Sequence, residues 1–177
     1  MKTVILDRDG TINHDSDQYI KSVAEWRPID GSLEAIARLS QAGYRVLVAT
    51  NQAGLARGLF DAVTLAEIHD TMCRAVARHG GRIDAIFFCP HAPEAHCECR
   101  KPKPGMLLDI ARRFNLSLGD VRMVGDTLRD LQAASAAGAH PVLVRTGNGA
   151  AAERAGGLPP GTRVFADLAA FAESITA

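Results

Sequence analysis

A doubly wound α/β domain built around a mostly parallel sheet is the fold that the sequence predicts. Short apolar runs rich in Val, Ile, Leu and Phe alternate with amphipathic stretches, which is the pattern of buried parallel strands joined by crossover helices. The chain has 177 residues, of which 47% are hydrophobic, and this is enough to cover such a sheet on both faces. We therefore expect one domain over residues 1–177, without a large cap domain.

The expected strands and helices follow one another along the whole chain. Strands are predicted at residues 3–6, 45–49, 85–88, 122–124 and 141–144, with a short last strand at 163–165. Helices are predicted at 32–42, from a capping box at Thr64 and Glu67 to about His79, from Pro104 at the first helical position, in a segment closed by Gly138, and at 168–175. The glycine-rich stretch 147–161 is interpreted as a surface excursion.

The charge balance argues against a polyanionic partner. Lys plus Arg and Asp plus Glu both total 20, so the formal net charge is zero, and no basic stripe is visible. We therefore expect neither a nucleic acid nor a membrane as partner. The first apolar run reaches charged residues at Asp7 too early for a signal peptide, which favours a cytoplasmic protein. No obvious interface segment is present, so a monomer is expected.

Two carboxylates follow the first predicted strand, in the segment Asp7-Arg8-Asp9-Gly10-Thr11. The two-residue period of a strand turns Asp7 and Asp9 toward the same side. Two bare carboxylates repel each other, so one of them must be neutralised by a proton or by a cation such as Mg²⁺. Gly10 permits a tight turn away from the strand. Taken alone, the segment could equally be an acidic turn that caps a helix.

Polar residues suited to phosphate or metal binding also follow later strands. Thr50-Asn51-Gln52 offers a hydroxyl and backbone amides for phosphate oxygens. Arg100 and Lys101 bring positive charge to a predicted helix N-terminus. Asp126 and Asp130 add carboxylates after the fourth strand, where Asp126 could also cap the next helix. Each segment alone could be an ordinary polar turn or solvated loop, but their occurrence at successive strand ends predicts a phosphate and metal site.

Three cysteines and a histidine are crowded between the third strand and Arg100. Cys89, His91, Cys97 and Cys99 offer three thiolates and an imidazole, a ligand set suited to Zn²⁺. In a reducing cytoplasm this clustering favours a metal over disulfides. Four protein ligands leave no open coordination position, so we expect a structural zinc that holds the loop leading to Lys101. His96 is the alternative to His91, and the Cys-x-His spacing favours His91.

The order Asp-x-Asp-Gly-Thr, Thr50, Lys101 and Gly-Asp-x-x-x-Asp resembles the four motifs of the haloacid dehalogenase superfamily across nearly the whole chain. This resemblance implies a Mg²⁺-dependent phosphatase in which Asp7 is the nucleophile and Asp9 is the general acid and base. The carboxylates of Asp7 and Asp126 and the backbone carbonyl of Asp9 would hold Mg²⁺, and Asp130 would steady a metal-bound water. Thr50 and Lys101 would hold the transferring phosphoryl group, with Arg100 as a further catalytic candidate.

The zinc loop directly before Cys-Arg-Lys-Pro resembles the branch that contains heptose-bisphosphate phosphatases and histidinol-phosphate phosphatases. Residues 50–58, 101–106 and 125–134 look more like the heptose enzymes, while the short gap between His91 and Cys97 leaves the substrate or the anomer preference open, with histidinol phosphate as the alternative substrate. The heptose branch implies removal of the 7-phosphate from D-glycero-D-manno-heptose 1,7-bisphosphate, a small sugar phosphate that leads to lipopolysaccharide cores. Motif matching then gives candidate substrate contacts at Asp15, Tyr19, Asn51, Gln52, Ala53, Arg57, Arg100 and Lys101. Of these, Arg100 is suited to grip the second phosphate in a bidentate way.

Two other classes of protein share part of this pattern. A non-enzymatic phosphoacceptor signalling domain also combines acids, Thr and Lys on a doubly wound sheet. Asp9 argues against it, because a base beside the phosphorylated residue shortens the life of the phosphoryl group. A zinc module that binds nucleic acid is disfavoured by the neutral charge and by the lack of a basic or aromatic surface pattern.

Overall fold

All six strands of the central sheet run parallel in the computed structural model, which describes residues 2–177. They are β1 (Thr3–Leu6), β2 (Arg45–Asn51), β3 (Ala85–Cys89), β4 (Arg122–Gly125), β5 (His140–Val144) and β6 (Arg163–Phe165). Their order in the sheet is β3-β2-β1-β4-β5-β6. The predicted fold class and strand positions are therefore confirmed. The order reverses between β1 and β4, which is where doubly wound sheets bind their ligands.

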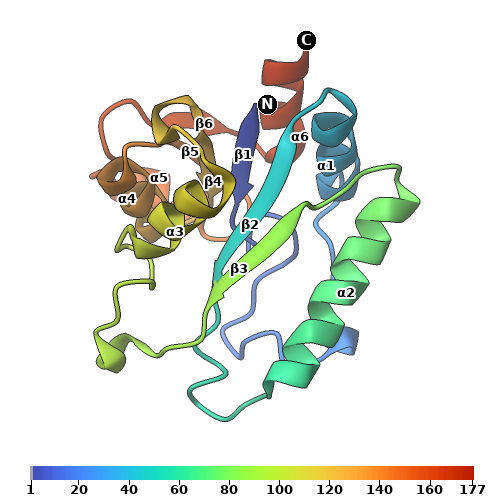
Figure 1. Cartoon of the computed structure of the whole chain (residues 1–177), viewed down its shortest axis with the longest axis vertical. Coiled ribbons are helices and arrows are strands. Elements are labelled where there is room, and N and C mark those ends of the chain that lie inside the picture. The colour runs from blue at the N-terminus through green and yellow to red at the C-terminus, as the bar shows by residue number, and fades with distance from the viewer. Residues whose placement is uncertain (1) are drawn as a thin grey trace.

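Helices cover both faces of the sheet (Figure 1). The helices are α1 (Ser32–Gln41), α2 (Ala62–Arg78), α3 (Gly105–Phe114), α4 (Leu128–Ala137), α5 (Gly149–Ala155) and α6 (Leu168–Thr176). Short 3-10 turns lie at Val23–Glu25, Pro93–Ala95 and Leu118–Asp120. Helices α1, α2 and α6 pack on one face, and α3 and α4 pack on the other. Within the described part of the chain, no helix is long and apolar enough to cross a membrane.

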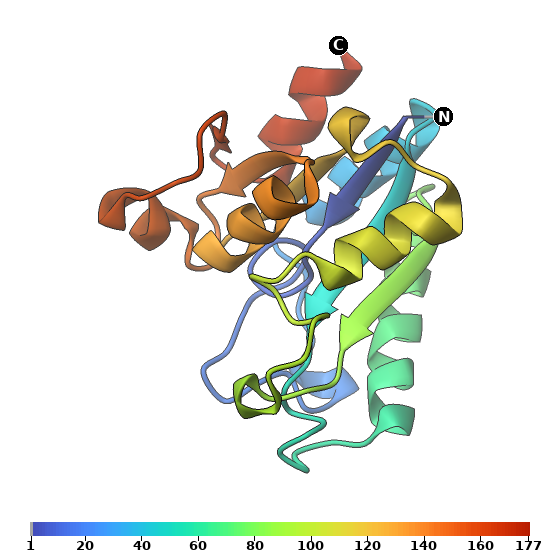
Figure 2. The same cartoon turned by 60° about the vertical axis from the view of Figure 1, so that its left-hand side comes forward.

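The alternating side chains of the strands divide the core into two apolar clusters. In β1, Val4 and Leu6 belong to the cluster under α1, α2 and α6, while Ile5 belongs to the cluster under α3 and α4. All three side chains are fully buried. This burial on both faces explains why the strand reads as a continuous apolar run and not as an alternating one. Figure 2 shows the loops that follow β1, β2 and β3 gathered beyond the carboxyl ends of these strands.

The predicted cap at Thr64 is wrong, and the alternative role of Asp126 as a helix cap is not found. Helix α2 begins at Ala62 because the Asp61 side chain caps it, accepting a hydrogen bond from Thr64 N at 2.8 Å, so Thr64 lies inside the first turn. Helix α4 is capped by Thr127 in a capping box with Asp130, and Asp126 does not cap it. In both places neighbouring residues are good caps by type, and the backbone path selects one of them.

Two further boundaries differ from the prediction, while two are confirmed. Pro104 is the N-cap of α3 and not its first residue, a shift of one position. The stretch 147–161 contains the helix α5, which its glycines hid from sequence analysis. Gly138 ends α4 in the left-handed conformation, as predicted. The terminal helix α6 also lies where it was expected.

Candidate active site

A cavity of about 220 Å³ lies beyond the carboxyl ends of the strands. Its lining includes every residue that the sequence predicts for catalysis, for Mg²⁺ or for substrate contact, namely Asp7, Asp9, Asp15, Tyr19, Thr50, Asn51, Gln52, Ala53, Arg57, Arg100, Lys101, Asp126 and Asp130. These residues come from loops that are far apart in sequence. The topology brings them together because parallel strands present all their carboxyl ends at one edge.

Asp7 and Lys101 form a buried ion pair at the base of the cavity. Lys101 Nζ donates to Asp7 Oδ1 at 2.8 Å and to the Ala49 carbonyl oxygen at 2.7 Å, and it lies 2.6 Å from Asp130 Oδ1. Burial alone would lower the pKa of Lys101, but the charges of Asp130 and Asp7 raise this pKa above its usual value. Lys101 is therefore a fixed cation beside the Asp7 carboxylate.

Three carboxylates converge beside this lysine. One oxygen each from Asp7, Asp126 and Asp130 lies within 4.8 Å of the others. Burial, followed by the charge of Asp130, raises the pKa of Asp7 well above its usual value and the pKa of Asp126 to about 7. Asp126 Oδ1 is buried without a hydrogen-bond partner among the described residues. Such crowded carboxylate oxygens are the ligands that a hard divalent cation such as Mg²⁺ prefers, so this donor set fits the ion.

Two backbone segments lie close to the carboxylate of Asp126. Gly10 has a φ of 81°, and a Cβ atom added there would overlap the Asp126 carboxylate. The same carboxylate is also held by the loop after β5, where Asn148 N donates to Asp126 Oδ2 at 2.8 Å. Asn148 Nδ2 also reaches Asp15 Oδ2 at 3.2 Å. Sequence analysis missed Asn148, because it lies in a stretch that shows no chemical pattern.

Asp9 lies on the same cavity but not in the carboxylate cluster. Its side chain accepts hydrogen bonds from Arg8 Nε at 2.9 Å, from Asn13 Nδ2 at 2.9 Å and from Gln52 Nε2 at 3.1 Å. The Asp7 carboxylate is paired with Lys101 instead. From the sequence, Asp7 and Asp9 are expected to repel each other, but in the structure each acid pairs with its own cation. The carboxylates that crowd together are those of Asp7, Asp126 and Asp130.

The carboxyl end of β2, at Thr50 and Asn51, and the following Gln52 hold other residues of the cavity in place. Asn51 Oδ1 accepts from Lys101 N at 3.1 Å, and Asn51 Nδ2 donates to the Lys101 carbonyl oxygen at 3.0 Å. Gln52 Nε2 donates both to Thr50 Oγ1 at 3.0 Å and to Asp9 Oδ2. The side chains of Asn51 and Gln52 thus hold neighbouring groups of the site, in addition to lining the cavity.

The outer wall of the cavity carries several cations. Arg57, Arg100 and Arg129 all line it, together with Tyr19, whose backbone is in the left-handed region at a φ of 64°. Burial, followed by the charge of Arg129, lowers the pKa of Arg100. Arg129 was missed by sequence analysis, because an arginine in the first turn of a helix is by type an ordinary surface residue. Two arginines so close together favour an anionic ligand group.

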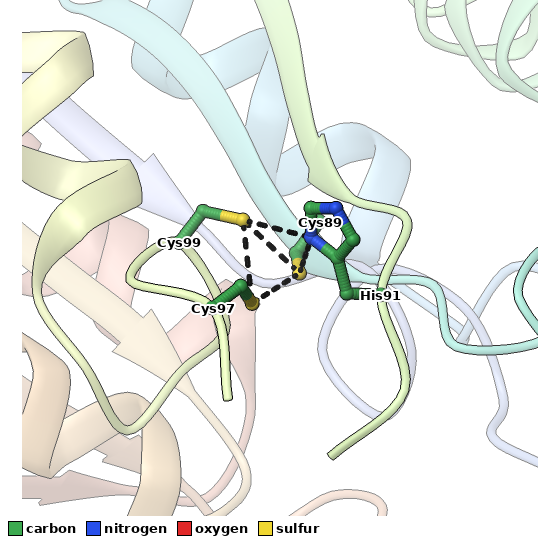
Figure 3. Close-up of side chains that lie close together, drawn as sticks. All are labelled: Cys89, His91, Cys97 and Cys99. Atoms are coloured by element: carbon green, nitrogen blue, oxygen red, sulfur yellow. Dashed lines mark hydrogen bonds between the residues drawn. The ribbon is translucent and has the colours of Figure 1, made fainter. Parts of the chain in front are cut away.

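The side chains of Cys89, His91, Cys97 and Cys99 point toward one another (Figure 3). They lie on the segment that leads from β3 to Lys101. Cys99 Sγ lies 3.3 Å from Cys89 Sγ, 3.6 Å from Cys97 Sγ and 3.4 Å from His91 Nδ1. A tetrahedral Zn–thiolate site with Zn–S bonds of about 2.3 Å has edges of roughly 3.8 Å, so these donor atoms are close to that spacing. The cluster includes His91 and leaves out His96, the alternative ligand. It could therefore bind a zinc ion.

Comparison with known proteins identifies the family. A model of HAD-hydrolase-like proteins matches residues 98–171. The D-glycero-β-D-manno-heptose-1,7-bisphosphate 7-phosphatase of Bordetella bronchiseptica is 61% identical over 175 residues, which cover 99% of this chain and 98% of that protein. The enzyme of the same name from Pseudomonas putida is 52% identical, with 99% of each chain covered. This chain belongs to the D-glycero-β-D-manno-heptose-1,7-bisphosphate 7-phosphatase family.

Solved structures of members of this family have the same fold. The D,D-heptose 1,7-bisphosphate phosphatase of B. bronchiseptica, crystallised with magnesium and phosphate, superposes with a TM-score of 0.98 at 60% identity and covers 99% of this chain and 98% of its own. The Burkholderia thailandensis enzyme gives a TM-score of 0.81 at 51% identity, covering 100% and 99%. Membership of the D-glycero-β-D-manno-heptose-1,7-bisphosphate 7-phosphatase family makes this chain a phosphatase, as the sequence predicted, and not a phosphoacceptor signalling domain.

Proposed function

We propose that this chain removes the 7-phosphate of D-glycero-β-D-manno-heptose 1,7-bisphosphate in a Mg²⁺-dependent reaction, on the path to activated heptose for lipopolysaccharide cores. The observation that carries the proposal is the buried contact of Asp7 Oδ1 with Lys101 Nζ at 2.8 Å, beside the converging carboxylates of Asp126 and Asp130. The choice of substrate and of the β anomer is supported by the name of the relative that is 61% identical over nearly the full length of both chains.

In the proposed reaction Asp7 is the nucleophile. Its carboxylate oxygen bonds to phosphorus while the bond from phosphorus to the sugar oxygen breaks, and Asp9 gives its proton to that oxygen. A water then attacks the phosphorus of the aspartyl phosphate and loses a proton to Asp9, which frees Asp7 and inorganic phosphate. Lys101 and Thr50, which line the same cavity, are proposed to stabilise the oxygens of the transferring phosphoryl group.

The proposed Mg²⁺ ligands are the carboxylates of Asp7 and Asp126 and the backbone carbonyl of Asp9. The unpartnered Oδ1 of buried Asp126 supports this set. Asp130 is proposed to lie outside this ligand set and to steady a metal-bound water. Its Oδ1 pairs with Lys101, and its Oδ2 accepts a hydrogen bond from Thr127. When bound, Mg²⁺ offsets the repulsion between the Asp7 carboxylate and the phosphate that approaches it.

A structural Zn²⁺ is proposed for Cys89, His91, Cys97 and Cys99. Their donor atoms are 3.3 to 3.6 Å apart along the contacts that the structure records, and the segment joins β3 to Lys101. A closed set of four ligands would fix the path of this loop, and so the positions of Arg100 and Lys101 at the edge of the sheet. The proposed role of the zinc ion is therefore to fix the position of Lys101, and not to take part in the reaction.

Specificity is proposed to come from the outer wall of the cavity. Arg100, together with Arg129, would bind the 1-phosphate. Asp15, Tyr19, Ala53 and Arg57 would contact the sugar or the loops around it. Lys103, by contrast, pairs with the exposed Glu98 at 2.6 Å and is not among the residues that line this cavity. We further propose one domain over 1–177 that acts as a cytoplasmic monomer on a small sugar phosphate.

A phosphate-release assay with Mg²⁺ tests the proposal. The β and α anomers of heptose 1,7-bisphosphate, heptose 7-phosphate and histidinol phosphate are compared at matched concentrations. We expect the highest kcat/KM for the β bisphosphate, and a phosphoryl adduct on the Asp7 peptide after acid quench and mass spectrometry. Asp7→Asn is the control, for which no adduct is expected. A preference for histidinol phosphate, or an adduct that persists in Asp7→Asn, would contradict the proposal.

A further inference from the structure

A charged side chain is completely buried directly behind Asp9. Arg8 has no exposed surface, although a guanidinium is costly to bury unless its donors are satisfied. Its Nε donates to Asp9 Oδ1 at 2.9 Å and its Nη2 to Asp9 Oδ2 at 3.1 Å, so it grips both oxygens of that carboxylate. Its Nη1 lies 3.1 Å from His69 Nε2. The guanidinium thus connects the site to helix α2.

His69 is the acceptor at the far end of this connection. Burial, followed by the charge of Arg8, lowers the pKa of His69 to about 4. The ring is therefore neutral at pH 7, and its Nε2 can accept the hydrogen bond from Arg8 Nη1. The ring is packed against Phe88 of β3, with 6.3 Å between ring centroids. His69 does not line the cavity of the active site, and its hydrogen bond with Arg8 Nη1 is its link toward Asp9.

The contacts around Asp9 leave its carboxyl group little freedom. In addition to Arg8, Asn13 Nδ2 donates to Oδ1 and Gln52 Nε2 donates to Oδ2. The side chain keeps 21% of its surface exposed, and it lines the cavity. A group that hands a proton to a leaving oxygen must be within hydrogen-bond reach of it and correctly oriented. The hydrogen bonds from His69 through Arg8 reach this carboxyl group from inside the protein.

We propose that Arg8 and His69 are positioning residues for the proton transfers of Asp9, with His69 fixing the guanidinium and the guanidinium fixing the carboxyl group. The inference rests on the proposed function in one respect, that Asp9 is the general acid and base. A purely structural role for the two residues would stabilise the fold without favouring either chemical step.

Substitution of His69 separates these two roles, because an amide can replace the acceptor and an alkyl group cannot. His69→Gln keeps an acceptor near the position of Nε2, whereas His69→Leu leaves Arg8 Nη1 without one. For His69→Leu we expect kcat with heptose bisphosphate to fall about 10-fold, a fraction of what general acid–base catalysis contributes, with KM changed less than about twofold. His69→Gln should recover most of this loss. His79→Leu, just beyond the end of the same helix, is the matched control and should behave as wild type.

A burst experiment with p-nitrophenyl phosphate gives a readout that misfolding cannot imitate. Nitrophenolate leaves without a proton, so phosphorylation of Asp7 should be little affected in His69→Leu, while hydrolysis of the aspartyl phosphate still needs the base. We expect a burst of nitrophenolate close to one per active site, followed by a slow steady state. A burst reduced in amplitude, or no loss of steady-state rate with either substrate, would overturn the inference. If wild type fails on heptose bisphosphate, the proposed substrate is wrong, but the burst still tests the network.

Discussion

The ammonium group of Lys101 lies 2.8 Å from the carboxylate of Asp7, with both side chains almost fully withdrawn from solvent. The same ammonium lies 2.6 Å from Asp130. Breaking a buried ion pair by removing one partner is strongly destabilising, because the other charge is left uncompensated. Lys101 is therefore both a part of the fold and the cation nearest to the atom that is proposed to attack phosphorus.

Lys101→Met should lower kcat/KM at least about 100-fold, since a fixed donor to the transferring phosphoryl group is lost. Lys103→Met is the matched control, because Lys103 is half exposed and pairs with Glu98 at the surface. This control should stay within about twofold of wild type, as surface ion pairs contribute little. Steady-state kinetics and thermal unfolding of the two variants check the prediction. The assignment of the two lysines would have to be reversed if Lys103→Met proved the more damaged.

Asp126→Asn should abolish the stabilisation of the protein by Mg²⁺. A ligand that binds only the folded state stabilises it by about 2.7 kcal/mol at 100 times its Kd, so Mg²⁺ should raise the Tm of wild type. The substitution removes one of three crowded carboxylates, and so the metal-free variant should be at least as stable as metal-free wild type. Asp120→Asn, in the 3-10 turn before β4, is the control. A Mg²⁺-dependent rise in Tm that survives in Asp126→Asn would count against this ligand.

The buried His69 should make the folded protein less stable as the pH falls. Its pKa is about 4 in the folded protein and 6.5 in the unfolded chain, so between these values the unfolded chain binds a proton that the folded protein does not. The free energy of unfolding therefore falls as the pH drops from 6.5 toward 4, by about 3 kcal/mol in total from this residue. Urea unfolding at pH 7 and pH 5 should give a smaller pH difference for His69→Gln than for wild type. Equal pH differences would show that His69 is not held neutral.

The strands and most of the site could be predicted from the sequence because both depend on short, local patterns. β1 and β2 read as apolar runs, and the topology then fixes that Asp7 and Thr50 emerge at the same edge. Where a choice depends on the path of the backbone, prediction failed. Asp61 and Thr64 are both good helix caps by type, and only the turn before α2 decides that Asp61 accepts the hydrogen bond.

The residues that sequence analysis missed are those that act through a distant partner. Asn148 holds Asp126 from a loop after β5, and His69 meets Arg8 from the middle of α2. Neither residue belongs to a motif, and by composition each is an ordinary loop or core residue. The helix α5 was hidden for a related reason, since Gly147 and Gly149 at its start weigh against a helix.

Cys97→Ser should abolish zinc binding and lower the activity, without changing any residue of the proposed active site. Loss of one of four ligands typically empties a structural zinc site, and the loop between β3 and Lys101 then loses its cross-link. We expect about one zinc per chain in freshly purified wild type and almost none in the variant, together with a lower Tm and a lower kcat/KM. Cys73→Ser, on α2 away from the cluster, is the control and should keep its zinc. Wild-type protein free of zinc but fully active would refute the structural role, because the position of Lys101 would then not depend on a metal.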